Sequence, residues 1–173
     1  LGKIAGSSRH LLELVNDVLD MSKIESGKLS ISHEPFNLRS SIQNINNLIR
    51  PQAQARQLDF DIFLTGVDEE ELCGDSLRLN QILLNILSNA LKFTPRGGSI
   101  RLEIMQLAKK RNTIRLRFII SDTGIGMSED FLQRLYQPFE QASASTAARY
   151  GGTGLGMPIT SNLVSLMGGV ISV

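Results

Sequence analysis

The chain has 173 residues, of which 42% are hydrophobic and 5% aromatic, and its formal net charge is +1. This composition supports an aliphatic core and excludes a disordered chain, and the small net charge argues against a strongly cationic nucleic-acid binder. The single cysteine, Cys73, excludes an intramolecular disulfide. No apolar stretch approaches the roughly 20 residues of a transmembrane helix. Glycine is concentrated late in the chain, since 10 of the 15 glycines lie from Gly97 onward.

The first 26 residues predict one helix, because apolar residues recur at spacings of three and four. Gly27 is placed to end it. The apolar stripe is wide for a lone surface helix, so we expect this helix to pack against other helices, including helices of another chain. A helix docked on its own domain is the alternative interpretation. The stripe comprises Ile4, Leu11, Leu12, Leu14, Val15, Val18, Leu19 and Met21.

The next part of the chain predicts alternating strands and helices. Residues 28–34 alternate in polarity and predict a short strand, and Asn37 is expected to cap a helix. Residues 59–67 predict a second strand. Asp75 is expected to cap a long apolar helix from about residue 76 to 93.

The second half begins with two strands, 99–107 and 113–121, which a short basic turn joins into an antiparallel hairpin. Irregular glycine-rich sequence follows, with a helix expected at 128–136 and a last helix from about 155 to 167. The final residues, 170–173, predict a strand and suggest that further strands of the domain are truncated. Helices interleaved with strands predict an α+β fold, a two-layer α/β sandwich with a mixed sheet.

Three segments carry residues suited to nucleotide chemistry. Asp122 follows a strand and precedes Gly124 and Gly126, so a carboxylate that accepts from an amine lies beside backbone that a flat ligand can approach. The run from Gly152 to Gly156 leads into a helix, where N–H groups and the helix dipole favour an anion. A turn and a flexible loop are the respective structural alternatives.

The third segment is the long central helix, in which Asn85, Asn89 and Lys92 share one polar face. An amide oxygen suits a hard cation, and a lysine suits phosphate. An ordinary solvated face is the alternative, although such faces more commonly use Glu and Lys than Asn. Together the three segments predict a site for Mg-ATP that lacks a P-loop.

The motifs also resemble, in order, those of sensor histidine kinases, members of the ATPase superfamily that includes gyrase and heat-shock chaperones. DSLRLNQILLNILSNALKFTPRG resembles the N box, SDTGIGM the first glycine box, LYQPFEQ the F box and RYGGTGLGMPIT the second glycine box. SSRHLLELVNDVLDMSKIESGKL resembles the second helix of the dimerisation and histidine-phosphotransfer hairpin. The resemblance implies that residues 1–27 are part of that hairpin and that 28–173 are the catalytic domain, with the Bergerat fold and helices on one face of the sheet.

The resemblance also implies roles for individual residues. It places Asn89 on Mg²⁺ with Asn85 supporting that face, Lys92 on phosphate and Phe93 in the nucleotide pocket. Asp122 would accept the adenine amine, with Gly124 and Gly126 against the base. Residues 128–151 would be a lid. Further contacts to ATP would come from Arg149, Gly152, Thr153, Gly154, Leu155 and Gly156.

The sequence departs from the family pattern at several points, including Tyr136 in place of the usual Phe of the F box and Pro158 in place of a small residue. Two departures concern the chemistry directly. The phosphoacceptor motif, His-Glu/Asp followed by Arg-Thr-Pro, does not occur in these residues, and His10 lies several turns from where the acceptor would be. The arginine common near the end of the lid is replaced by Ala148, for which Arg149 is the substitute.

The resemblance predicts transfer of the γ-phosphoryl of ATP to a histidine on a dimerisation helix. The implied partners are that helix, a response-regulator receiver domain and a second copy of the kinase, in the cytoplasm and without nucleic acid or direct membrane contact. We expect the fragment to bind Mg-ATP without phosphorylating itself. Two alternatives stay open, a nucleotide-binding regulatory module and an ATPase without phosphotransfer. Asn85 stands where such ATPases usually have a general-base Glu, which argues against the second.

Overall fold

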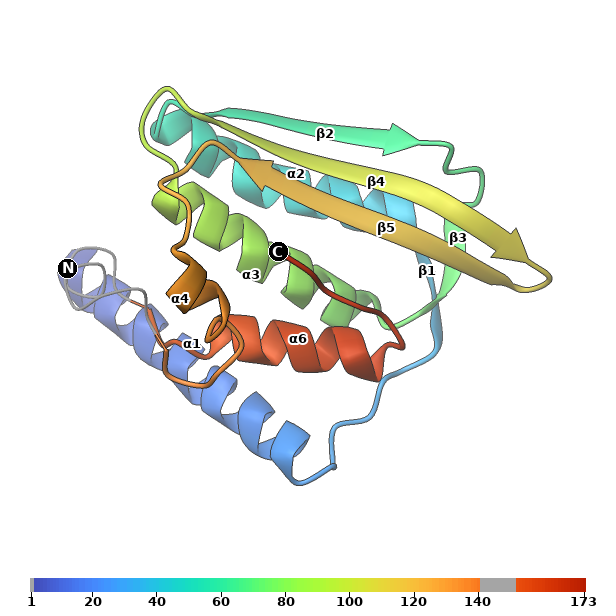
Figure 1. Cartoon of the computed structure of the whole chain (residues 1–173), viewed down its shortest axis with the longest axis horizontal. Coiled ribbons are helices and arrows are strands. Elements are labelled where there is room, and N and C mark those ends of the chain that lie inside the picture. Colours follow the sequence, from blue (N-terminus) through green and yellow to red (C-terminus); the bar gives the residue numbers. More distant parts are fainter. Residues whose placement is uncertain (1, 141–151) are drawn as a thin grey trace. The chain divides into compact units, whose positions relative to one another are not determined.

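The structure is a computed structural model that describes residues 2–140 and 152–173, with the side chains of residues 2–10 and 13 excepted (Figure 1). The chain forms two compact units. Ser32–Gly126 make up the first, here called the sheet unit. Leu1–Ile31 and Met127–Val173 make up the second, here called the terminal unit. No helix in the described part combines the length and apolarity that a bilayer crossing needs.

The sheet unit contains a three-stranded mixed sheet and a separate two-stranded pair. The sheet has the order β2-β4-β5, in which β2 (Asp59–Thr65) pairs parallel with β4 (Ser99–Lys110) and β4 pairs antiparallel with β5 (Thr113–Asp122). The second pair joins β1 (Glu34–Asn37) to β3 (Glu71–Gly74) in antiparallel register. The predicted strand at 59–67 and the predicted hairpin are therefore confirmed.

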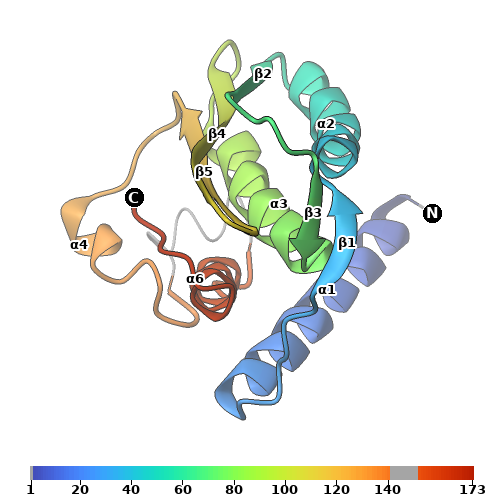
Figure 2. The same ribbon diagram turned by 90° about the vertical axis from the view of Figure 1, so that its right-hand side faces the viewer.

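Two helices, α2 (Leu38–Ala55) and α3 (Ser76–Phe93), cover one face of this sheet, as Figures 1 and 2 show. Their apolar sides and the inward residues of the strands form one aliphatic core, which confirms the two-layer α/β sandwich with a mixed sheet. Burial of this apolar surface is the main force that holds the helices on the sheet. Its largest fully buried side chains include Leu38, Ile45, Ile49, Leu83, Leu87, Ile100, Leu102 and Ile104.

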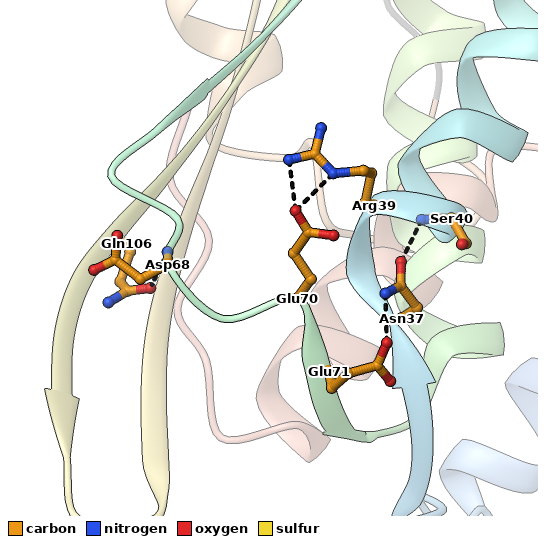
Figure 3. Close-up of polar contacts among 7 residues, drawn as sticks. All are labelled: Asn37, Arg39, Ser40, Asp68, Glu70, Glu71 and Gln106. Carbon is orange, nitrogen blue, oxygen red and sulfur yellow. Dashed lines mark hydrogen bonds and ion pairs between the residues drawn. The ribbon is translucent and has the colours of Figure 1, made fainter.

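Polar contacts fix the start of α2 to the segment before β3 and to the first residue of that strand (Figure 3). Asn37 accepts from the Ser40 N–H at 2.8 Å, as its predicted capping role requires, and its Nδ2 donates to Glu71 Oε1 at 2.6 Å. The Arg39 guanidinium donates two bonds to Glu70 Oε1 at 2.6 and 2.5 Å and lowers the pKa of that carboxyl. The same segment also donates a hydrogen bond to the sheet, from the Asp68 N–H to Gln106 Oε1 at 3.2 Å.

In the terminal unit, α1 (Gly2–Glu25) confirms the predicted long helix. Beyond it, Gly27 has φ +65° and the Lys28 N–H donates to the Lys23 carbonyl at 2.9 Å, which ends the helix as expected. The last helix, α6 (Gly156–Leu166), is also confirmed, and it contacts α1. Pro158 lies in its first turn, where no intrahelical N–H bond is lost.

Two predicted elements have other bounds than expected, and a third, the strand at 170–173, does not form among the residues that the structure describes. Residues 28–33 form no strand, because only residues 34–37 find a partner. That partner is the short strand β3, which the sequence pattern did not predict. The helix expected at 128–136 is the single turn α4 (Glu129–Leu132), capped by Ser128, and tighter three-residue turns follow it. Residues 170–173 pair with no strand in the described part of the chain, and an extended segment without a ladder is not a strand.

Asp75 begins the central helix as predicted and also ties it to the chain that enters β1. The residue is buried, and its Oδ1 accepts from the Arg78 N–H at 2.9 Å while Oδ2 accepts from the Ser32 N–H at 3.0 Å. Burial raises the pKa of Asp75, but the backbone bonds from Ser32 and Arg78 outweigh burial, so the pKa lies below its ordinary value of 3.8. The ionised carboxylate therefore stabilises the fold.

We predict that Asp75→Ala lowers the free energy of unfolding by about 1–2 kcal/mol at neutral pH, because a helix cap and a second buried bond are lost. The folded pKa lies below the unfolded one, so this contribution is complete above the unfolded pKa and disappears as the pH falls through the folded pKa. Urea unfolding of both proteins across the acidic range measures it. Asp61→Asn, at an exposed strand position, is the control. An equal stability gap at all pH values would contradict the assignment.

Candidate functional site

The central helix α3 carries the predicted polar face. Asn85, Asn89 and Lys92 are half-buried and follow one another at helical spacing, on a helix whose apolar side is in the core. Lys92 Nζ lies 4.8 Å from the centroid of the Phe93 ring. Burial lowers the pKa of Lys92 below its ordinary value of 10.5. An anion placed beside this ammonium group would offset that desolvation, so the face favours a negatively charged ligand.

The Asp122–Gly126 loop lies where β5 ends. Asp122 is exposed, and its Oδ1 accepts from the Gly124 N–H at 2.8 Å. A carboxylate has about four acceptor positions, so this bond orients the group and leaves capacity for an amine of a ligand. The loop therefore presents a fixed acceptor at the edge of the sheet.

This loop is attached to the C-terminal end of α3. The Ile125 N–H donates to the Phe93 carbonyl at 3.3 Å. A Cβ on Gly124 would lie 2.9 Å from the same carbonyl oxygen and 2.5 Å from Asp122 Oδ1, so no other residue fits there without displacing backbone. The structure thus brings Asp122 and Gly124 together with Phe93, the neighbour of Lys92.

The base of the loop is held by hydrogen bonds between Thr123 and Ser99, two residues that the sequence patterns did not indicate. The Thr123 N–H donates to the Ser99 carbonyl at 3.1 Å, and the Ser99 N–H donates to Thr123 Oγ1 at 2.9 Å. A Cβ on Gly98 would lie 2.5 Å from Thr94 Cγ2 and 2.7 Å from Thr123 Oγ1. The sequence signal was the second glycine of the turn after α3, which marks this close approach.

The second glycine loop, Gly152–Gly156, lies in the terminal unit before α6. Gly154 has φ +70°, and its carbonyl accepts from the Phe139 N–H at 3.0 Å. A Cβ on Gly154 would lie 2.8 Å from the Phe139 backbone, so this position also requires glycine.

Thr153, the residue between these glycines, bonds on both sides. Its Oγ1 accepts from the Leu155 N–H at 3.0 Å and donates to Asp17 Oδ2 on α1 at 3.1 Å. No sequence pattern predicts the role of Asp17, because the two residues are 136 positions apart in the chain.

Some predicted residues lie outside the described part of the chain. These are Ala148, Arg149 and the lid residues from 141 onward, and the side chain of His10 is likewise outside it. The described start of the lid contains α4 and an ion pair between Arg134 and Glu140 at 2.5 Å.

We predict that Gly124→Ala lowers the free energy of unfolding by about 1–3 kcal/mol, because the added methyl displaces the loop from Phe93. Thermal unfolding measures the loss. Gly74→Ala is the matched control, since a Cβ there meets only a Phe36 ring atom at 3.4 Å. Equal melting temperatures for Gly124→Ala and the unsubstituted chain would disprove the close approach.

Comparison with known proteins gives a family match over residues 74–173, to the histidine kinase-, DNA gyrase B- and HSP90-like ATPases. The matched range includes α3, the Asp122–Gly126 loop and the Gly152–Gly156 loop. It therefore contains every residue of the candidate site that the structure describes, apart from Asp17.

Individual relatives agree with the family match. The sensory/regulatory protein RpfC of Xanthomonas campestris pv. campestris (strain 8004) is 42% identical over 171 residues, which are 99% of this chain and 24% of the relative. The sensor histidine kinase GacS of Pseudomonas protegens is 43% identical over 173 residues, 100% of this chain and 19% of the relative. The chain thus spans a quarter or less of these proteins.

Among solved structures, full-length ShkA in complex with AMPPNP is similar with a TM-score of 0.76 and 31% identity, over 94% of this chain and 32% of ShkA. The fold of this chain is thus similar to part of the ShkA structure over nearly all of its length. The chain belongs to the histidine kinase-, DNA gyrase B- and HSP90-like ATPase family.

Proposed function

We propose that this chain is the ATP-binding catalytic part of a sensor histidine kinase, which donates the γ-phosphoryl of Mg-ATP to a histidine on a dimerisation helix. The observation that carries the proposal is the attachment of the Asp122–Gly124 loop to the end of α3 at Phe93. That attachment joins an amine acceptor to a half-buried helix face with a desolvated lysine. The names of RpfC, GacS and their relatives as sensor proteins and kinases support the proposal.

The sheet unit binds the adenine base in this proposal. Asp122 accepts from the exocyclic amine with the carboxylate capacity that the Gly124 bond leaves over. Gly124 and Gly126 let the base approach the backbone, and Phe93 lines the pocket. A guanine base presents a carbonyl where adenine has its amine, so the same carboxylate disfavours it.

The polar face of α3 suits a magnesium ion that is held mostly by phosphate. Among the described residues no group of three or more His, Cys, Asp or Glu side chains is placed to hold a metal. Mg²⁺ in nucleotide sites typically takes only one or two protein oxygens and keeps water and phosphate oxygens, so the Asn89 amide oxygen fits. Bound Mg²⁺ neutralises phosphate charge during phosphoryl transfer. Asn85 supports Asn89, and Lys92 contacts phosphate.

The Gly152–Gly156 loop contributes backbone donors to phosphate in the same proposal. It precedes α6, so the N–H groups of Gly152, Gly154, Leu155 and Gly156 lie at the positive end of the helix dipole. Arg149 supplies a further cation from the lid. Thr153 already uses its hydroxyl within the protein, where it donates to Asp17 and accepts the Leu155 N–H.

The domain boundaries and partners are part of the proposal too. Residues 1–27 are the second helix of the dimerisation hairpin, and 28–173 the catalytic domain. The apolar face of α1 supports this, because it is exposed at five positions: Leu11, Leu12, Val15, Val18 and Leu19 are between 48% and 62% exposed. Such a stripe needs a partner helix. The phosphorylated histidine passes its phosphoryl group to a response-regulator receiver domain.

Labelled phosphate transfer tests the function. We expect that the chain with Mg²⁺ and γ-labelled ATP acquires no acid-labile label, because its residues lack the His-Glu/Asp and Arg-Thr-Pro motif. Addition of a two-helix hairpin that carries the motif should produce phosphohistidine on the hairpin. Asn89→Ala should reduce the transfer at least about tenfold, and Asn47→Ala, on an exposed part of α2, should not. Label on the chain alone would refute the assignment.

The pKa of Lys92 provides a second test. Burial disfavours its ammonium form, and a bound phosphate favours it. Nucleotide binding should therefore raise this pKa, and protons should be taken up at pH values between the pKa of the free protein and that of the complex. Calorimetric titration in two buffers of different ionisation enthalpy measures the uptake. Lys92→Met should abolish it, whereas Lys28→Met, at an exposed site, should leave it unchanged.

A further inference from the structure

Within the sheet unit, the helices α2 and α3 lie on the same side of the three-stranded sheet (Figure 2). The inward side chains of its strands, such as Phe60 and Leu102, belong to the core beneath these helices. Successive side chains of a strand point to opposite faces, so the residues between the inward ones form the other face. We call this other face of β2, β4 and β5 the outer face.

The centre of the outer face is partly apolar and nearly neutral. In the strand register Phe63 lies opposite Glu103, which in turn lies opposite Ile119. Phe63 is 46% exposed. The Arg101 guanidinium lies 5.2 Å from the centroid of the Phe63 ring, and its Nη1 is 3.5 Å from Glu103 Oε1. The central charges are therefore neutralised within the face itself, and an aromatic ring is left accessible.

Two corners of the outer face carry opposite charges. Asp59 and Asp61 stand at the start of β2, beside the first residues of β4. Arg115 and Arg117 stand on β5, on the other side of β4 and beside its later residues. All four side chains are exposed, and in the described part of the chain they form no ion pair with one another or with other residues. The acidic corner and the basic corner thus lie diagonally across the face.

The corners belong to longer runs of one charge. Residues 59–75 contain seven acidic residues and no Lys or Arg, whereas residues 104–121 contain five basic residues and no Asp or Glu. The net charge of the whole chain is only +1, so the two signs are separated rather than in excess. One pair is neutralised inside the chain, because Lys109 donates to Glu69. The two corners remain available for complementary charges of a partner.

We propose that the outer face binds a second copy of this chain. A two-fold axis in the plane of the contact brings the acidic corner of each copy onto the basic corner of the other, so that the charge contact occurs twice. The same rotation places the two apolar centres against each other. Packing with equal corners together would oppose like charges and is disfavoured. The contact lies in the sheet unit and goes beyond the proposed function, in which copies meet through α1.

We expect a weak dimer, because the face spans only three short strands. A dissociation constant of about 10–1,000 µM is typical of so small a contact. Raising the salt concentration to about 0.5 M should weaken the dimer, since the corner charges are exposed.

Sedimentation equilibrium of two charge-reversed proteins tests the arrangement. One carries Asp59→Lys with Asp61→Lys, and the other carries Arg115→Glu with Arg117→Glu. Each alone should associate at least about tenfold more weakly than the unsubstituted chain, because both corner contacts then join like charges. An equimolar mixture should recover the original association within about threefold, because both contacts are again complementary. This recovery also shows that the two proteins are folded.

A matched control separates the outer face from net charge. Lys28→Glu with Arg50→Glu alters two exposed residues outside the face by the same total charge as the arginine reversal, and it should change the association by less than about twofold.

Three results would overturn the proposal. They are a chain that stays monomeric at about 1 mM in low salt, reversed proteins that associate as the unsubstituted chain does, and a mixture that recovers nothing. Association that survives both reversals would come from another surface, such as the exposed apolar side of α1. Nucleotide binding plays no part in this measurement, so the proposed function is tested separately.

Discussion

The carbonyl group of Phe93 joins the end of α3 to the loop after β5, and the arrangement of the candidate site depends on this contact. The carbonyl accepts from the Ile125 N–H, and Gly124 passes so close to it that a side chain would collide. The contact is possible only because the core first holds α3 on the sheet. Aliphatic packing thus supplies the framework, and a few backbone bonds place the polar groups within it.

The electrostatics of the sheet unit follow from the same packing. Lys92 is at the end of a helix whose other side is buried, and its partial burial disfavours the charge that it carries. The partly desolvated ammonium group of Lys92 is less stable without an anion beside it. A bound anion therefore stabilises this group more than it would stabilise the ammonium group of a fully solvated lysine. This explains how a chain with a net charge of +1 can be suited to a polyphosphate without a basic surface.

In the terminal unit, the helix α1 differs from α2 and α3 in how its sides are buried. In α1 one apolar side is exposed, and a second side carries Asp17, which accepts a hydrogen bond from Thr153 of the loop before α6. Many helices have one buried side and one solvated side. The helix α1 departs from this pattern, because it has an exposed apolar side as well as a half-buried side that contacts the loop.

The sequence alone determined most of the local structure. Capping residues and apolar periodicity located α2, α3, α6 and the β4–β5 hairpin, because these signals are short-range and strong. Ordered motifs of glycine, asparagine and aspartate indicated the family that the comparisons confirm. The roles of the individual site residues remain predictions.

Tertiary structure decided what depends on partners distant in the chain. The strand expected at 28–34 lies instead at 34–37, because a strand exists only where another strand completes its hydrogen bonds. The partner strand β3 is distant in the chain, since Glu34 pairs with Gly74 and Asn37 pairs with Glu71. Two further contacts likewise join residues that no sequence pattern relates. They are the hydrogen bond from the Ser99 N–H to Thr123 Oγ1 and the bond from Thr153 Oγ1 to Asp17. Local propensity fixes where helices and turns begin, whereas pairing across the fold is fixed only when the core has brought the partners together.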